Sequence, residues 1–436
     1  MKPGRVRTRR TDIPVPAGVR VAAAGWRRDA APAIRDLWRR HGTAVLLAAI
    51  ASMMAVALWR LGNELPRLLW ETGGLGAFDL QLRHQEVQRW FSGLTVYGPV
   101  QRGDYPPASY AILWPLLGWL DIPAARALWA ATTVASMAWL ARIAARESTS
   151  SYRLHVLLMM LLPFSTYAAS AAIRVGQVGN HVIPMLVAGL LLLHRGRGRW
   201  WEDAFAAGLL IPALVKPILT VPFFWLACFV PGRLRPIILV SVGYMLVTLF
   251  AASFQAGDPA SILLGWLGER PQALQGHANI HKWLALAGLR DWMIPATAAI
   301  LLALGVWVHR FREADVWILL GVSALVARFF VHHRLYDDML VLLPMITLFR
   351  IAHMGPREGG GDVAAGLLFA AMWLTLHAPA SLLQYPAPVS TFMEAGQTGV
   401  WLVALVFLLY RARRAPVARQ CDPNPEAECL AVSRTD

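Results

Sequence analysis

Long apolar segments alternate with short polar ones along this chain. The segments 43–59, 236–254 and 363–383 each run with almost no charged residue. Each reaches the roughly 17 residues that a helix needs to cross the hydrocarbon core of a bilayer. Inside lipid the backbone polar groups must be satisfied within the segment, which favours helices. The pattern therefore predicts an all-α, polytopic integral membrane protein.

We expect about twelve transmembrane helices from this pattern. The predicted membrane segments lie at 43–60, 107–143, 154–173, 181–193, 204–230, 236–254, 292–308, 315–331, 339–353, 363–383 and 398–410. The segment 107–143 starts with Pro106-Pro107 and has a short first part, so we interpret it as one interrupted crossing. The run 204–230 contains Lys216-Pro217, which favours two short helices that meet there over one continuous helix.

Two longer polar segments, 61–106 and 255–291, separate these runs. In the first, apolar side chains recur at spacings near three and four: Phe78, Leu82, Val87, Trp90 and Phe91. This spacing predicts an amphipathic helix that lies at the membrane interface.

Positive charge is concentrated at the chain ends and in the short loops. Residues 1–42 hold eleven Lys and Arg against three acids. Because Lys and Arg are enriched on the cytoplasmic side, we expect a basic cytoplasmic arm at 1–42, a membrane domain at 43–410 and a disordered cytoplasmic tail at 411–436. Both termini are then cytoplasmic, and 61–106 and 255–291 form outer loops of the cytoplasmic (inner) membrane.

Composition narrows the classes of function. The chain is 57% apolar and 15% charged, with a mean hydropathy of +0.47, which excludes water as its main solvent. The net charge of +15 follows from topology and from attraction to anionic membrane lipids, so nucleic acid is not an expected partner. Cys228, Cys421 and Cys429 show neither metal-ligand spacing nor a disulfide framework.

The predicted topology gathers polar side chains on the outer side of the bilayer. They are Asp79, Arg83, His84, Glu86, Asp104, Tyr105, Arg174, Gln177, Asn180, Lys216, Asn279, His281, Lys282, His332, His333, Arg334, Tyr336, Asp337 and Asp338. Topology explains basic inner loops, but it does not explain acids, histidines and amides beside outer helix ends. We therefore expect an outward-facing site built from several loops.

Six segments carry a resemblance to a known group of enzymes. They are 78–98, Asp104-Tyr-Pro-Pro, Gly176-Gln-Val-Gly-Asn, Ala207-Gly followed by Lys216-Pro217, Gly276-His-Ala-Asn-Ile-His, and His333-Arg-Leu-Tyr-Asp. In this order the chain resembles membrane glycosyltransferases of the GT-C superfamily, in particular the polyprenol-phosphate-mannose-dependent alpha-mannosyltransferases. The resemblance extends from about residue 75 to about residue 345 and agrees with the hydropathy pattern.

The resemblance implies transfer of a hexose such as mannose from a polyprenyl-phosphate sugar to a lipid or glycan acceptor at the outer membrane face. It also implies an acidic catalytic base in the first outer loop, and Asp79 is the matching position. A carboxylate suits this role because direct displacement at the anomeric carbon needs a base for the acceptor proton. Alternatively, Asp79 is a helix N-cap or an ion-pair partner of Arg83. Asp104 is the second candidate base.

The leaving phosphate needs cations or hydrogen-bond donors around it. The candidates are Lys216, Arg174, His332, His333 and Arg334. The alternative for Lys216 is a lysine at a helix end that extends to the interface, and the alternative for either of the two histidines is an interfacial or packing role. No Asp-X-Asp pair occurs, and a donor with a single phosphate needs no metal, so we expect neither metal nor cofactor.

Sugar and acceptor contacts are expected from further loop residues. They are Asp104, Tyr105, Gln177, Asn180, Asn279, His281, Tyr336 and Asp337. The alternative role of Gln177 and Asn180 is to cap helix ends. The alternative for Tyr336 and Asp337 is that they form the start of a helix. His281 stands where the resemblance leads us to expect a small hydroxyl residue, which leaves the acceptor open.

Two other classes of protein share this hydropathy. A multi-pass transporter or flippase of envelope lipids or glycans places ionisable residues near mid-membrane and often has repeated halves. Here no internal repeat is visible and the polar residues gather at outer loops. A non-catalytic scaffold of envelope assembly has no need of Asp79.

Overall fold

The computed structural model describes residues 31–71, 76–98, 103–268, 278–353 and 362–414. Within these ranges the regular elements are α-helices and short 3-10 helices, with no strand among them. The all-α prediction is confirmed. The predicted tail from 415 onward and residues 1–30 of the predicted arm lie outside the described residues.

The helices differ widely in length. In chain order the elements are α2 (Ala31–Trp70), α3 (Phe78–Phe91), α4 (Pro107–Leu117), α5 (Ile122–Glu147), α6 (Arg153–Leu161), α7 (Tyr167–Val175), α8 (Gly179–Arg195), α9 (Trp200–Ala213), α10 (Pro217–Thr220), η2 (Val221–Phe223), α11 (Phe224–Phe229), α12 (Arg235–Ala252), α13 (Pro259–Gly268), α14 (Ile280–Leu286), η3 (Arg290–Trp292), α15 (Met293–Arg310), α16 (Val316–Phe329), η4 (Leu335–Val341), α17 (Leu342–His353), α18 (Val363–His377), η5 (Ala380–Leu383) and α19 (Val389–Arg414).

Five described helices are long and apolar enough to cross a membrane. They are Asp36–Trp70, Ile122–Glu147, Arg235–Ala252, Arg290–Arg310 and Val389–Arg413. α7 and α8, bent by 119° at their junction, make a sixth span if the pair counts as one. The number of twelve crossings is not confirmed in the described chain. Several predicted spans are shorter helices. α16, for example, has 14 residues and is about 21 Å long, whereas the hydrocarbon core of a bilayer is about 30 Å thick.

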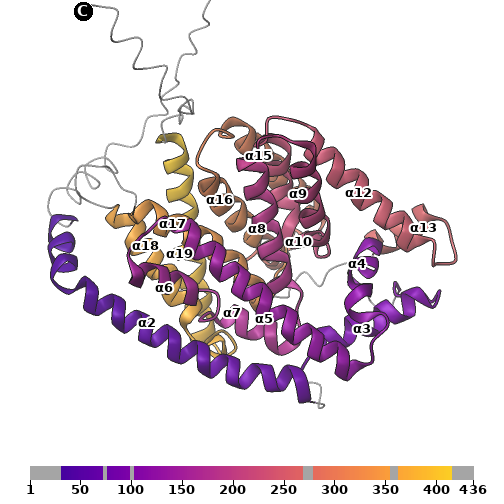
Figure 1. Ribbon diagram of the computed structural model, residues 1–436, viewed down its shortest axis with the longest axis horizontal. Coiled ribbons are helices and arrows are strands. Elements are labelled where there is room, and N and C mark those ends of the chain that lie inside the picture. Colours follow the sequence, from indigo (N-terminus) through magenta and orange to yellow (C-terminus); the bar gives the residue numbers. More distant parts are fainter. Residues whose placement is uncertain (1–30, 72–75, 99–102, 269–277, 354–361, 415–436) are drawn as a thin grey trace, which may run out of the picture.

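Some helix bounds differ from the prediction. The first span, expected at 43–60, belongs to the longer helix α2, which continues to Trp70 and runs along the lower edge of the bundle in Figure 1. The expected interrupted crossing 107–143 consists of two helices, and the second, α5, is long enough to cross by itself. Hydropathy locates apolar segments, but it does not indicate how far a helix continues through polar residues at its ends.

The break at Lys216-Pro217 is confirmed. α9 ends at Ala213, and the next helix, α10, begins at Pro217. Pro217 lacks a backbone N–H and has a fixed φ, which suits the first position of a helix and not its interior. The break places Lys216 between two helices.

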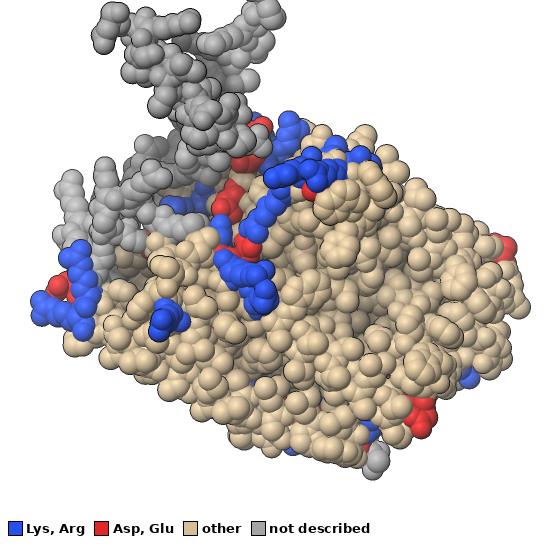
Figure 2. Space-filling model, viewed as in Figure 1, with Lys and Arg blue, Asp and Glu red and all other residues tan. Residues whose placement is uncertain are grey.

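Charged side chains mark one end of the bundle. Figure 2 shows Lys and Arg gathered at the upper end of the face in view, while the broad middle of that face carries few charges. Where α5 and α8 end, Glu147 accepts hydrogen bonds from Arg195 Nη1 (2.6 Å) and Trp317 Nε1 (2.9 Å), and in the first turn of α9 Asp203 pairs with Arg233 (2.6 Å). We call the end of the bundle at which α5 and α8 end and α9 begins the basic end. The helices that begin or end there have their other termini at the opposite end, which we call the polar end.

The core lies where the central helices pack against one another. α8 packs along α9 and α5, α16 along α17, and α12 along α4 and α9. Gly321 allows the close approach of α16 and α17, since a Cβ atom there would lie 2.8 Å from Thr347 Oγ1. This packing fixes the ends of α8, α9 and α16, and those ends carry the polar residues described next.

Candidate active site

Lys216 and Asp337 form a buried ion pair at the polar end. Lys216 Nζ donates to Asp337 Oδ1 at 2.6 Å, and the two side chains are 6% and 3% exposed. The Lys216 ammonium also lies 4.7 Å from the centre of the Tyr336 ring. The alternative of a lysine that extends along a helix end to the interface is therefore wrong. The helix break between α9 and α10 brings Lys216 to η4.

The charge of Asp337 is stabilised by its surroundings. Burial raises the pKa of Asp337, but the Lys216 ammonium and His333 together outweigh burial, and the pKa lies well below its ordinary value. His333 is also buried: its Nε2 lies 2.7 Å from the Ala327 carbonyl oxygen and its Nδ1 3.3 Å from Asp337 Oδ2. A carbonyl oxygen only accepts, so Nε2 carries a proton, and Nδ1 can donate to Asp337 only while the ring is charged. Burial lowers the pKa of His333, which favours the neutral ring.

Asp79 lies in the first turn of α3, with its side chain buried. Gln177 Nε2 donates to Asp79 Oδ2 at 2.8 Å, and the Tyr105 hydroxyl donates to Gln177 Oε1 at 3.1 Å. The backbone holds the same arrangement, because Ala77 N donates to the Arg174 carbonyl oxygen at 2.7 Å. Three segments that are distant in sequence thus meet at one carboxylate.

Neither structural alternative for Asp79 is observed. The N-cap of α3 is Ala77, in the left-handed conformation and without a side-chain cap. Arg83 pairs instead with Glu86 Oε2 (2.5 Å) and Asp104 Oδ1 (2.9 Å), and its guanidinium lies 4.1 Å from the centre of the Tyr105 ring. Arg83 thereby ties α3 to the loop before α4.

The electrostatics of Asp79 suit a proton acceptor. Burial raises its pKa, while the charges of Lys216, Arg83 and Arg334 and the Gln177 hydrogen bond oppose the rise. The cations stabilise the ionised carboxylate, and burial favours the protonated one. Such a balance of opposing effects is typical of functional carboxyl groups.

Tyr336 joins the two parts of the site. Burial raises the pKa of its hydroxyl above the ordinary value; the charges of Asp337 and Asp79 add to the rise, and Arg334 and Gln177 oppose it. The Tyr336 hydroxyl therefore lies within electrostatic reach of both carboxylates. This links the Lys216–Asp337 pair electrostatically to the Asp79–Gln177 pair.

A second buried network lies behind η4. Arg328 Nε donates to Asp338 Oδ1 with both side chains fully buried, and the Tyr167 hydroxyl donates to Asp338 Oδ2. Gln397 Nε2 donates to the Tyr167 oxygen at 3.2 Å. The sequence alone predicts no role for Arg328, Tyr167 or Gln397. A lone arginine within the apolar run 315–331 was the available signal, since such a residue needs a buried partner.

Other predicted residues have different surroundings. Asn279 caps α14 by accepting from Lys282 N at 2.8 Å, and His281 Nε2 lies 2.7 Å from Thr297 Oγ1. Asp104, the second candidate base, has a side chain that is 67% exposed. Arg174 contributes its carbonyl oxygen, as described above. Asn180 is fully buried, and neither polar atom of its side chain has a hydrogen-bond partner within the described residues.

His332 and Arg334 flank His333. Burial, together with the neighbouring His333, lowers the pKa of His332 to about 4. The Arg334 backbone N–H donates to Asp337 Oδ2 at 3.2 Å, while its side chain is exposed. Among the described residues, no group of three or more His, Cys, Asp and Glu side chains is placed to hold a metal ion.

Comparison with known proteins gives one match. The sequence model of glycosyltransferase family 87 matches residues 104–344, which is more than half of the chain. The matched range contains Tyr105, Gln177, Lys216 and Asp337 and begins after Asp79. No curated protein and no solved structure matches the chain.

The buried Lys216–Asp337 pair should behave as a coupled unit in the fold. We expect Lys216→Met and Asp337→Leu each to lower the free energy of unfolding by about 3–5 kcal/mol, because each leaves an unpaired buried charge. The double variant should lose less than the sum of the two. Unfolding of the purified variants in detergent micelles measures these differences.

The Lys282–Glu394 pair is the matched control. Its side chains are 25% and 28% exposed, so breaking it should cost about 1 kcal/mol or less. Strictly additive effects of the Lys216 and Asp337 substitutions on the free energy of unfolding would contradict the coupling.

Acid should also destabilise the wild-type protein. The contribution of Asp337 to the free energy of unfolding is fully present above the unfolded pKa of about 3.9, and it falls as pH drops below that value.

Proposed function

Because the chain belongs to glycosyltransferase family 87, we propose that it transfers a hexose such as mannose from a polyprenyl-phosphate sugar to a lipid or glycan acceptor. The chain is a membrane glycosyltransferase. The donor, sugar, acceptor and mechanism proposed here rest on the polar-end site and on the sequence resemblance. Asp79 is the proposed general base.

One observation carries the proposal: a buried carboxylate, Asp79, lies within electrostatic reach of the cations Lys216 and Arg334. In direct displacement the acceptor oxygen forms a bond to the anomeric carbon of the sugar. The bond between that carbon and the phosphate oxygen breaks, and the polyprenyl phosphate leaves with the electron pair. Asp79 takes the acceptor proton. A base beside a cationic phosphate site meets both requirements.

The surroundings of Asp79 fit this cycle. Gln177 donates to the ionised carboxylate and holds one oxygen, so the other oxygen is left for the acceptor hydroxyl. Once Asp79 has taken the proton, burial stabilises the neutral acid. The same low-dielectric setting strengthens the attraction between the phosphate and nearby cations.

We assign the donor phosphate to Lys216 and Arg334. Lys216 has three N–H donors, and its bond to Asp337 uses one of them. Arg334 has an exposed side chain and also acts electrostatically on Asp79. Arg174, His332 and His333 were candidates on the same grounds. His333 suits the role less well, because both of its ring nitrogens already face Asp337 and Ala327.

Charge distribution suggests the orientation in the membrane. The arginine-rich segment 195–199 joins α8 and α9 at the basic end, and cytoplasmic loops are enriched in Lys and Arg. We therefore place the basic end and both termini in the cytoplasm, and the polar end on the outer side of the cytoplasmic membrane. No observation within the described residues favours the transporter or flippase alternative.

Asp79→Asn should abolish sugar transfer while the fold is retained. The amide keeps the size of the side chain, and its oxygen can still accept from Gln177, but it cannot take a proton. Loss of a general base costs about 10² to 10⁴ in rate. Transfer from a radiolabelled polyprenyl-phosphate hexose in membranes, together with the melting temperature of the purified variant, measures both effects.

Two companion variants sharpen the test. Asp104→Asn should lose less activity, because that carboxylate is exposed and paired with Arg83. Gln177→Leu removes a hydrogen bond that favours ionised Asp79, so the rise of the transfer rate with pH should move to higher pH. Near-normal transfer by well-folded Asp79→Asn would remove Asp79 from the mechanism and move the base to Asp104.

The orientation has its own test. In a variant without the three native cysteines, Ser92→Cys marks the polar end and Arg312→Cys the basic end; both positions are exposed. A membrane-impermeant maleimide should label Ser92→Cys in intact spheroplasts and Arg312→Cys only after lysis. The reverse labelling pattern would show that the proposed topology is inverted.

A further inference from the structure

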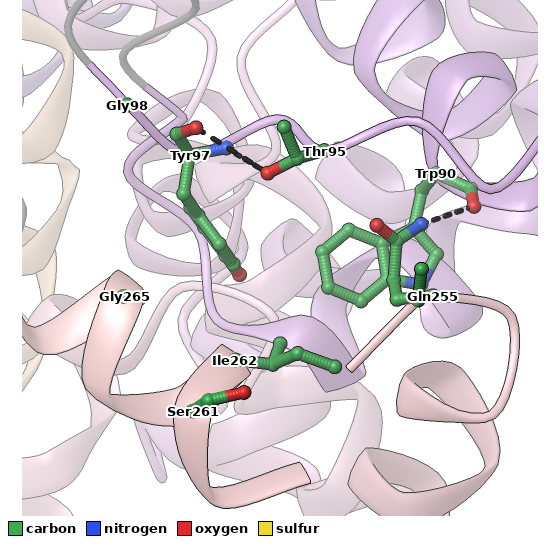
Figure 3. A pocket seen from close by; sticks show the side chains of 9 residues that line it. Trp90, Thr95, Tyr97, Gly98, Gln255, Ser261, Ile262 and Gly265 are labelled. Carbon is green, nitrogen blue, oxygen red and sulfur yellow. Dashed lines mark hydrogen bonds between the residues drawn. The ribbon is translucent and has the colours of Figure 1, made fainter. Parts of the chain in front are cut away.

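A cavity of about 330 Å³ lies between the segment that follows α3 and the start of α13. Its volume is within the range of small-molecule sites, which begins near 300 Å³. Figure 3 shows Tyr97 on one side of the open space, Trp90 and Gln255 on the other, and Ser261 with Ile262 below. The cavity is lined by Trp90, Thr95, Tyr97, Gly98, Gln255, Ala256, Ser261, Ile262 and Gly265. Both predicted outer loops contribute to it.

The walls of the cavity are held in place before any ligand binds. Trp90 is fully buried: its Nε1 donates to the Ala251 carbonyl oxygen at 2.8 Å, and its ring stacks on Tyr110 at 4.7 Å. Gln255 Nε2 donates to the Trp90 carbonyl oxygen at 2.5 Å, which directs the amide. Thr95 Oγ1 accepts from Tyr97 N at 3.2 Å. A preformed site of this kind loses little entropy on binding.

The lining indicates the chemistry of the ligand. None of the nine residues is charged, so the cavity offers no cation to a phosphate. Thr95, Gln255 and Ser261 supply hydroxyl and amide groups, which disfavours an alkyl chain. Tyr97 adds an aromatic ring that is only half-buried. Aromatic surface beside hydroxyl and amide groups matches a ring with apolar C–H faces and hydroxyl edges, that is, a neutral sugar.

The cavity is connected to Asp79 by hydrogen bonds. The Tyr97 hydroxyl donates to the Tyr105 carbonyl oxygen at 2.8 Å, and the Tyr105 hydroxyl donates to Gln177, the partner of Asp79. Asp79 and Trp90 stand at opposite ends of α3, about 16 Å apart at 1.5 Å per residue. This distance is longer than one hexose.

We propose that this cavity binds a sugar unit of the acceptor, and that the acceptor is a neutral oligosaccharide chain reaching from the cavity to Asp79. The inference rests on the proposed function and names the class of acceptor. The unit in the cavity is remote from the reacting hydroxyl, and its binding positions the far end of the chain at Asp79.

Binding of neutral oligosaccharides of graded length tests the assignment. The probes are fluorescently tagged oligomers of mannose, glucose and galactose, each of one to six units. The protein is held in lipid nanodiscs, because the head groups of alkyl-glycoside detergents would compete for the site. For at least one sugar we expect the affinity to increase tenfold or more between short and long oligomers, once the chain is long enough to enter the cavity.

Gly265→Trp fills the cavity. A Cβ atom at Gly265 meets only Tyr97 Cδ2, at 3.9 Å, so the backbone accepts a side chain there. This variant should bind long oligomers no more tightly than short ones. Leu264→Trp places the same ring on the neighbouring position of α13, where the side chain is 67% exposed and outside the cavity. In this control variant the affinity should still increase with oligomer length.

The outcomes separate the two proposals. Length-independent binding by the wild-type protein, no binding of any oligomer, or an equal gain in Gly265→Trp and Leu264→Trp would each overturn the cavity assignment. Transfer from the polyprenyl-phosphate hexose by the wild-type protein is measured separately, and its absence counts against the proposed function without deciding the binding result.

Discussion

Two adjacent carboxylates, Asp337 and Asp338, each hold a buried cation, and the polar end of the bundle is organised around them. Lys216 reaches Asp337 from the break between α9 and α10, and Arg328 reaches Asp338 from the last turn of α16. Charges in a low-dielectric interior are tolerated only when they are paired and hydrogen-bonded. The two pairs therefore require that α9 stop before Lys216 and that η4 follow α16 without a helical continuation.

The two buried ion pairs also determine the electrostatic environment of Asp79. Holding η4 in this position brings the Tyr336 hydroxyl and the Lys216 ammonium within electrostatic reach of Asp79. Burial of Asp79 then favours its protonated form, while the nearby cations favour its ionised form. A continuous helix through Lys216-Pro217 would separate these groups. The interruptions that shorten the apolar helices thus bring the residues of the proposed site together.

Much of this arrangement could be predicted from the sequence, and some could not. The break at Lys216-Pro217 follows from proline geometry, and the helical character of 78–91 follows from apolar spacing. The resemblance singled out Asp79, yet its partner Gln177 lies 98 residues away, and no local pattern indicates that contact. The count of about twelve spans is not confirmed, because short helices such as α16 look like crossings in a hydropathy profile. Arg328 gave a signal, an isolated charge in an apolar run, but its partner depends on tertiary packing.

We propose that Asp79 and Lys216 belong to one donor site at the polar end. A cryo-EM structure with a non-transferable polyprenyl phosphonate analogue of the sugar donor tests this assignment. We expect the phosphonate oxygens within about 4 Å of Lys216 Nζ or the Arg334 guanidinium, with the anomeric carbon facing Asp79. A donor head group bound at the basic end, beside Glu147 and Arg195, would contradict a donor site at Asp79 and Lys216.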